Sequence, residues 1–346
     1  MYTFSRSEKN KPIAEEYETR AMLYLMNKTW DESLDIFLID SFNDVSGTNQ
    51  HFNYIVDLQA KGIKDFPPSK IGESLITLFL NYISDFTFDS YILYCKSLNN
   101  DYLIESRNVG ISSHTVKEIS DDTIERIKKA LVKTINKEFG EEYLNVLGDG
   151  ILSDFFEKLH IVVDDGEKSQ HIKSILPIHQ LNQLSKKSLE AIFEDINNMR
   201  VSLKTNINLE NQKITRISEC LAYKKHLQRK TIESLVITRL VGYDIFKYNY
   251  SIPLYFSAYT DHLGIEEKKD LLQNVNSEVS KAFFDVNNSE VFFGFIDFIM
   301  NEVKNSKDVN LIFEITKSRG IEFPPQLTDI SAKFLISMII GGLYDN

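Results

Sequence analysis

The 346-residue sequence contains only two cysteines, Cys95 and Cys220. They stand far apart and have no Cys or His neighbours at metal-ligand spacing, which argues against a disulfide framework and a structural zinc site. No apolar run approaches the roughly 18 residues that a membrane-spanning helix needs, and the N-terminal segment lacks the apolar core of a signal peptide. These absences predict a cytoplasmic protein that does not associate with a membrane.

Basic residues are outnumbered by acidic residues, 39 to 50. The formal net charge is -11, which argues against a broad basic surface that holds DNA by itself. No Gly-x-x-x-x-Gly-Lys-Ser/Thr motif occurs, so a P-loop ATPase is excluded. Hydrophobic residues make up 42% of the chain, enough for cores in two or three domains.

The first hundred residues alternate between helical and strand-like patterns. Apolar spacing predicts a helix, two strands separated by a turn, a second helix and a short strand. These segments are residues 14–27, 31–40, 43–49, 52–61, 71–86 and 91–95 in that order. The order is typical of a small mixed sheet flanked by helices.

After about residue 115 the apolar spacing is mainly helical. Helices are predicted over residues 121–139, 141–159, 188–204, 211–240, 266–284, 289–305 and 326–342. We therefore expect an α+β chain with two parts. Residues 1–112 would form the sheet domain, and residues 113–346 a mainly α-helical region for partner binding or regulation.

One group of residues in the first part suggests catalysis. Asp44 follows the first predicted strand, and Gln59 and Lys61 lie on the second. Alternation along a strand puts Gln59 and Lys61 on one face, and Asp57 shares it. If the strands pair through the turn, Asp44 approaches them. A carboxylate and an amide oxygen suit Mg²⁺, and a lysine can orient the attacking water or stabilise charge on phosphorus.

The segments Asp40-Ser-Phe-Asn-Asp44-Val45 and Val56-Asp57-Leu58-Gln59-Ala60-Lys61 resemble the core of the PD-(D/E)xK nuclease superfamily. They are similar to its Gln-x-Lys branch, as in Mrr-like restriction enzymes. The closest likeness is to the double-stranded-DNA endonuclease domain of bacterial anti-phage effectors, of the CD-NTase-associated and Lamassu nuclease types. The resemblance covers about residues 12–100 and implies a restriction-endonuclease-like fold.

The resemblance also implies roles for individual residues. Asp44 and Gln59 would bind the metal, Mg²⁺ or Mn²⁺, and Lys61 would complete the catalytic group. Glu18, in a Tyr17-Glu18 pair on the first helix, is a second-rank candidate because an acid on that helix often reaches the metal or the lysine. Asp57 is another second-rank candidate, on strand parity alone. Two positions depart from the pattern: Asn43 stands where an acid is common, and Asp40 where Glu is usual.

The strongest basic cluster of the sequence lies elsewhere, at residues 224–230. On the long helix predicted there, it is either a solvated face or a contact surface for DNA phosphates or an acidic partner. The sequence does not choose between these alternatives.

The resulting expectation is a metal-dependent DNA endonuclease that acts as the effector of an anti-phage or anti-plasmid defence complex. Its substrate would be double-stranded DNA. By analogy with Lamassu-like systems, a partner, such as an SMC-type ATPase, would release or activate it, and the chain could also form homo-oligomers. Two alternatives stay open: a catalytically inactive nuclease-fold subunit that serves as an assembly module, and a nuclease that acts on RNA.

Overall fold

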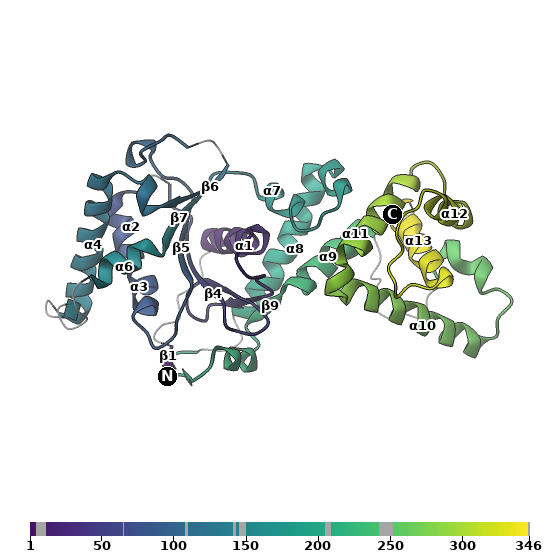
Figure 1. Cartoon of the computed structure of the whole chain (residues 1–346), viewed down its shortest axis with the longest axis horizontal. Helices are drawn as coiled ribbons and strands as arrows, with labels where there is room; N and C mark the ends of the chain where they lie inside the picture. The colour runs from purple at the N-terminus through teal and green to yellow at the C-terminus, as the bar shows by residue number, and fades with distance from the viewer. Residues whose placement is uncertain are drawn as a thin grey trace. The chain divides into compact units, whose positions relative to one another are not determined.

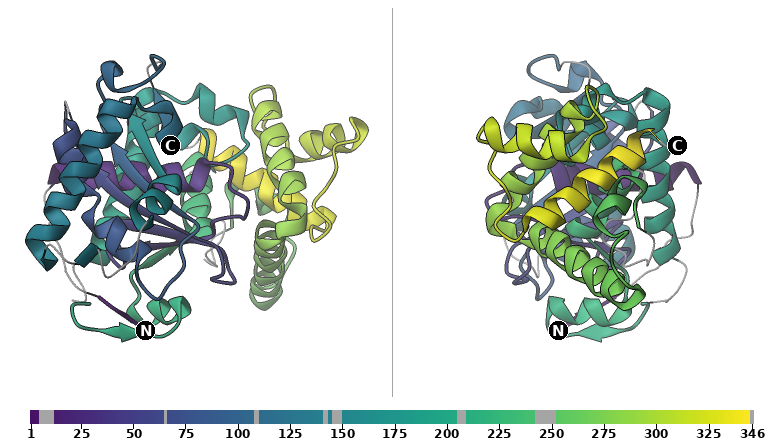
Figure 2. Two further views of the ribbon diagram at one scale, coloured as in Figure 1. Left: turned by 60° about the vertical axis from the view of Figure 1, so that its left-hand side comes forward. Right: turned by 90° about the vertical axis from the view of Figure 1, so that its right-hand side faces the viewer.

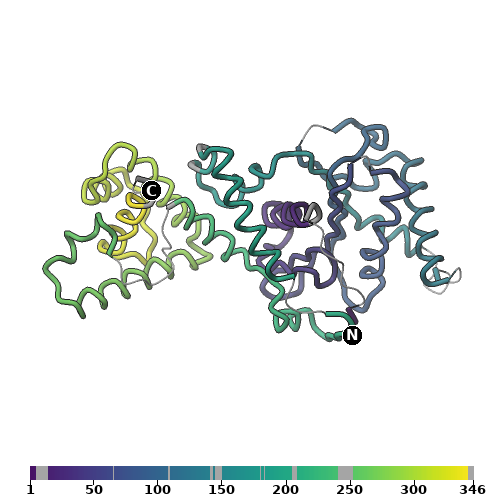
Figure 3. Tube along the Cα trace, turned by 180° about the vertical axis from the view of Figure 1, so that it is seen from behind, coloured from purple at the N-terminus to yellow at the C-terminus, as the bar shows by residue number. Residues whose placement is uncertain are grey.

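The computed structural model of the chain describes residues 1–4, 12–64, 66–107, 110–140, 143–144, 150–204, 209–241 and 252–344. The chain divides into two compact units. Unit 1 comprises Met1–His171 and Phe193–Arg229, and unit 2 comprises Ile172–Ile192 and Lys230–Asn346. The polypeptide therefore passes between the units three times, and its course can be followed along the trace in Figure 3.

Unit 1 is built on a seven-stranded mixed sheet of order β6-β7-β5-β4-β3-β2-β9. Its strands are β2 (Ile36–Ile39), β3 (Val45–Thr48), β4 (Ile55–Lys61), β5 (Ser90–Cys95), β6 (Ile111–Thr115), β7 (Leu159–Asp164) and β9 (His226–Gln228). Strands β4, β5 and β7 run parallel, and the other neighbours pair antiparallel. The central strands β2 to β5 are buried on both faces, and β2 and β5 accordingly have nearly continuous apolar sequences, whereas β3 and β4 also contain buried polar residues.

Helices cover both faces of this sheet (Figure 1). Helix α1 lies on one face, against β3 and β4, and α2, α3, α4 and α6 lie on the other. These helices are α1 (Pro12–Asn27), α2 (Pro68–Ser74), α3 (Ile76–Tyr82), α4 (Asp121–Phe139) and α6 (Ile151–Glu157). A Cβ atom added at Gly47 on β3 would come within 2.9 Å of Leu34, which precedes β2, and 3.6 Å of Leu25 on α1, so both side chains pack closely over this position.

Shorter elements complete unit 1. Strands β1 (Tyr2–Thr3) and β8 (Lys213–Ile214) form a separate two-stranded sheet. The 3₁₀ turns are η1 (Asn100–Tyr102), η2 (Val116–Glu118) and η4 (Ile217–Tyr223). Helices α7 (Lys168–Lys173) and α8 (Lys186–Lys204) each contain one of the crossings between the units.

Unit 2 is helical in its described part. Helix α13 packs against α10, α11 and α12, as the right-hand view in Figure 2 shows in yellow and green. The elements are η3 (His179–Gln183), α9 (Arg229–Val241), η5 (Leu254–Tyr259), α10 (Ile265–Phe284), η6 (Val286–Asn288), α11 (Ser289–Glu302), α12 (Val309–Ser318) and α13 (Asp329–Tyr344). Buried phenylalanines such as Phe283 and Phe292 join α10 to α11. Within the described ranges, none of the helices combines the length and hydropathy needed to cross a bilayer.

The α+β class is confirmed, with a mixed sheet between helices and a helical C-terminal region. The boundary predicted at residue 112 needs correction, because it falls inside β6, and β7 and β9 beyond it belong to the same sheet. The helix predicted over residues 211–240 is also wrong. That segment contains β8, η4 and β9 before α9 begins at Arg229. Strands that pair with distant partners leave only a short local pattern, so their presence was missed.

Candidate active site

The loop that was predicted as a turn contains a strand. Residues 45–48 form β3, which pairs antiparallel with β2 on one side and with β4 on the other. Ser46 lies opposite Asp57, and Val45 opposite Leu58. Asp44 directly precedes β3, so continuing this register places it opposite Gln59. The predicted pairing of residues 31–40 with residues 52–61 is replaced by pairing of each with β3, and Asp44 reaches Gln59 because it directly precedes β3.

Asp44 and Gln59 are in direct contact. The Gln59 Nε2 atom donates to Asp44 Oδ2 at 2.5 Å, and the backbone N–H of Ala60 donates to the same oxygen at 2.7 Å. The hydroxyl of Thr77 on α3 donates to Gln59 Oε1 at 3.0 Å. Asp44 is 7% exposed and Gln59 is 3% exposed. The pair is therefore held in one geometry and is largely shielded from water.

Lys61 is the last residue of β4 and is half-buried. It lies two positions after Gln59 and therefore on the same face of the strand. The chain leaves the sheet at Gly62, where a Cβ atom would stand only 2.9 Å from the ring of Tyr17 on α1. Close packing of this aromatic ring explains the glycine directly after the candidate catalytic lysine.

Asp57 has a different environment. Its side chain is completely buried and accepts hydrogen bonds from Asn43 Nδ2 at 2.5 Å, Asn81 Nδ2 at 2.7 Å and the Ser46 hydroxyl at 2.8 Å. Burial raises the pKa of Asp57 to about 6, although these three donors favour its charged form. With its oxygens enclosed by donors from three segments, Asp57 serves the packing of β3, β4 and α3.

Glu18 is engaged by cations of α8. Its Oε2 atom accepts from Arg200 at 2.6 Å and is also paired with Lys204. Arg200 is fully buried, and it also donates to the Thr19 hydroxyl and to the backbone carbonyl of Glu15, each at 2.7 Å. No contact between Glu18 and the pair Asp44–Gln59 is seen in the described residues, so Glu18 joins α1 to α8.

The residues of the site offer few metal ligands. Among the described residues, no group of three or more His, Cys, Asp and Glu side chains stands close enough to hold a metal ion. Asp44 supplies one carboxylate, and Gln59 carries one amide oxygen. Both are oxygen donors of the kind that Mg²⁺ takes, and Mg²⁺ commonly keeps several waters beside one or two protein ligands. Because Gln59 turns its Nε2 atom towards Asp44 and its oxygen towards Thr77, the pair fits a mostly hydrated ion only after the Gln59 amide turns over.

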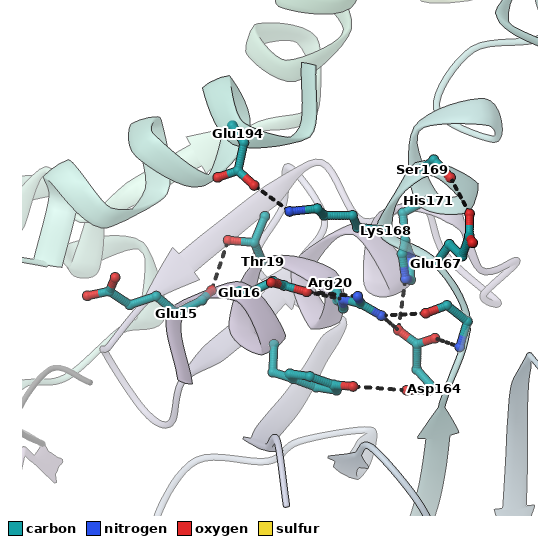
Figure 4. A network of polar contacts seen from close by, with 12 residues as sticks. Glu15, Glu16, Thr19, Arg20, Asp164, Glu167, Lys168, Ser169, His171 and Glu194 are labelled. Carbon is teal, nitrogen blue, oxygen red and sulfur yellow. Dashed lines mark hydrogen bonds and ion pairs between the residues drawn. The ribbon is translucent and has the colours of Figure 1, made fainter. Parts of the chain in front are cut away.

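A second polar network lies at the end of β7 (Figure 4). The buried Asp164 carboxylate accepts from the Tyr94 hydroxyl at 2.5 Å, His171 Nε2 at 2.9 Å and Arg20 Nη1 at 3.4 Å. Burial acts to raise the pKa of Asp164, but His171, Tyr94 and Arg20 outweigh it and hold the pKa at about 2. Arg20 also donates to the backbone carbonyl of Gly166 at 2.8 Å, so the network fixes α1 to the end of β7.

Sequence reasoning missed Thr77, Arg200 and Lys204 as neighbours of the candidate residues. Thr77 stands on the helix that follows β4, where a polar residue on an apolar face was the available signal. Arg200 and Lys204 are more than 180 positions from Glu18, and no local pattern links them. Comparisons of the chain with known protein families, with curated proteins and with solved structures give no match.

Proposed function

We propose that the chain is a metal-dependent nuclease that hydrolyses phosphodiester bonds of DNA. The observation that carries this proposal is the contact between Asp44 and Gln59, with Lys61 on the same strand face. Order and pairing of the elements give support: α1 is followed by three antiparallel strands, helices α2 and α3, and the parallel strand β5. This arrangement agrees with the fold that the resemblance to PD-(D/E)xK nucleases implies.

Each residue has a chemical task in the proposed reaction. Asp44 and the Gln59 amide oxygen would hold Mg²⁺ or Mn²⁺, which polarises the phosphoryl oxygen and activates water when bound. Lys61 would stabilise the charge that develops on the phosphate, since its ammonium lies on the strand that bears Gln59. The Gln59 side chain and the Ala60 backbone N–H both donate to the Asp44 carboxylate, which is only 7% exposed, so they would keep it in place beside the metal.

Control by partners is part of the same proposal. The net charge of -11 weakens attraction to DNA, and an unrestrained DNase would damage its own host. We infer that the chain acts as the effector of a bacterial anti-phage or anti-plasmid defence complex, in the cytoplasm, with a protein partner such as an SMC-type ATPase. The helices of unit 2 would provide the surface for such a partner or for self-association.

One observation favours a second candidate function. The Gln59 amide is hydrogen-bonded at both ends, to Asp44 and to Thr77, and both Asp44 and Gln59 are nearly covered. Such a closed group also suits a nuclease fold that has lost catalysis and serves as an assembly module. In the active alternative, the group opens when DNA, metal or a partner binds.

A cleavage assay separates the two functions. The full chain, alone and with the products of its neighbouring genes, is incubated with plasmid DNA or RNA and Mg²⁺. Lys61→Ala should abolish cleavage, whereas the exposed Lys64→Ala, three residues further along, should leave it unchanged. Equal cleavage by both variants would remove Lys61 from the mechanism. No cleavage of either nucleic acid under any partner condition would support the assembly module.

A further inference from the structure

A cluster of charged residues in unit 1 contains more cations than anions. It consists of Glu18 on α1, Asp40 after β2, Arg200 and Lys204 on α8, and Lys225 before β9. Lys204 is paired with Glu18 and lies 3.4 Å from Asp40 Oδ1. Glu18, Arg200 and Lys225 are buried, the side chain of Lys204 is 5% exposed, and Asp40, with a side chain 25% exposed, is the most open member. Three cations face two carboxylates, so one positive charge is left without a counter-charge.

Lys225 carries that uncompensated charge. The residue is only 5% exposed, and its ammonium makes no ion pair or hydrogen bond with any residue in the described part of the chain. Burial lowers the pKa of Lys225; Asp40 opposes this effect, and Lys204 adds to it. An unpaired buried ammonium lowers the stability of the fold, and such a group is commonly retained because it binds something.

The cluster adjoins the candidate catalytic residues through the backbone. The N–H of Asp40 donates to the carbonyl of Asp44 at 3.2 Å, and the N–H of Ile39 donates to the carbonyl of Lys225 at 2.9 Å. Asp40 and Lys224 both adopt left-handed backbone conformations, with φ of 45° and 55°. The connection between β2 and β3 therefore holds Asp44 at its β3 end, and the charged cluster lies beside its β2 end.

We propose that Lys225 and Lys204 form a phosphate-binding subsite that holds a backbone phosphate of duplex DNA next to the cleavage site. This inference rests on the proposed nuclease function, because that function supplies the substrate. A phosphate provides the missing negative charge, and a lysine ammonium binds it as a point charge on a flexible stem. The arrangement is also compatible with the net negative charge of the chain, since DNA would be held at one local site rather than by a basic surface.

The test measures DNA binding without cleavage. Binding of a fluorescent duplex oligonucleotide to the full chain is followed by anisotropy in EDTA over a series of salt concentrations. Lys225→Met removes the charge and keeps most of the stem, and Lys224→Met is the matched control, because Lys224 is the exposed neighbour. Lys225→Met should weaken binding about tenfold and reduce the salt slope by about one. Lys224→Met should change neither quantity by a comparable amount.

Thermal unfolding of the same variants excludes a merely structural role. Removing an unpaired buried charge should leave Tm unchanged or raise it, whereas loss of a structural contact would lower it. The inference is overturned if wild type and Lys225→Met bind the duplex equally, or if the wild type does not bind it in EDTA at low salt. Loss of binding in Lys225→Met together with absence of cleavage in the wild type would leave the subsite standing and remove the nuclease function instead.

Discussion

The Asp44 carboxylate receives two donors from β4, the Gln59 side chain at 2.5 Å and the Ala60 backbone at 2.7 Å. One donor is a side-chain amide, and the other is a backbone N–H of the sheet. The carboxylate is therefore anchored to β4 even when the Gln59 amide is released. In the proposed nuclease, the Ala60 donor would keep Asp44 attached to β4 when the Gln59 amide turns towards a metal ion.

Substitution of Asp44 should separate catalysis from stability. We expect Asp44→Asn to abolish cleavage while lowering the free energy of unfolding by only about 1 kcal/mol, because an acceptor oxygen remains. Asp44→Ala should lower it by about 2–3 kcal/mol, since two buried donors lose their acceptor. Urea unfolding and plasmid cleavage of both variants check this. Full cleavage by Asp44→Asn would contradict its role as metal ligand.

The raised pKa of Asp57 predicts a pH-dependent stability. The pKa is about 6 in the fold against an ordinary value of 3.8 for an aspartate, so the folded chain binds the proton more tightly. Stability should therefore fall as pH rises from about 4 through about 6, by about 3 kcal/mol from this group. Asp57→Asn removes this dependence. The comparison is the change in unfolding free energy between pH 4 and pH 7 in both chains, and equal changes would contradict the prediction.

Asp164 should have the opposite effect. Its pKa of about 2 lies below the ordinary value of 3.8 for an aspartate, so its contribution to stability is present above pH 4 and is lost as pH falls towards 2. We expect the wild type to lose about 2 kcal/mol through this group in that range, and Asp164→Asn to lack this loss. Asp122→Asn, on the exposed surface of α4, is the control. If Asp164→Asn loses as much unfolding free energy as the wild type between pH 4 and pH 2, Asp164 is not the source of the loss.

The Arg200–Glu18 pair should behave as a buried ion pair. Arg200→Met leaves Glu18 buried with Lys204 as its remaining cation, and we expect a loss of about 3 kcal/mol in unfolding free energy. Because the two residues contact each other, the double variant Glu18→Gln, Arg200→Met should lose less than the single losses combined. Urea unfolding of the wild type, the two single variants and the double variant gives the coupling free energy between Glu18 and Arg200. Strict additivity would mean that Arg200 acts through Thr19 and Glu15 alone.

The sequence predicted those helices and strands whose apolar residues recur at the spacing of a helix or a strand. Helix α1 and strands β4 and β5 lie close to the predicted residues 14–27, 52–61 and 91–95. Strands β3 and β9 were missed for different reasons. Gly47 and Asn49 made the β3 segment look like a turn, and β9 has only three residues, whose partner on β2 is about 190 positions away.

The candidate site was predictable in part. Alternation on β4 correctly placed Gln59 towards Asp44, because a two-residue period is a local property of a strand. The burial of Asp57 was not predictable, since Asn81 on α3 encloses it from a distant segment. The same holds for Lys225, which was predicted on a helix surface and instead lies buried before β9.

The three passages of the chain between the units have a consequence for how this protein can evolve. A gene fragment that ends near residue 171 would encode a sheet without β9 and without Arg200. Unit 2 likewise lacks Ile172–Ile192 if it is expressed from residue 230 onwards. Recombination at a single junction therefore cannot exchange either unit as an intact cassette. Substitutions in one unit therefore accumulate while the other unit is encoded by the same gene.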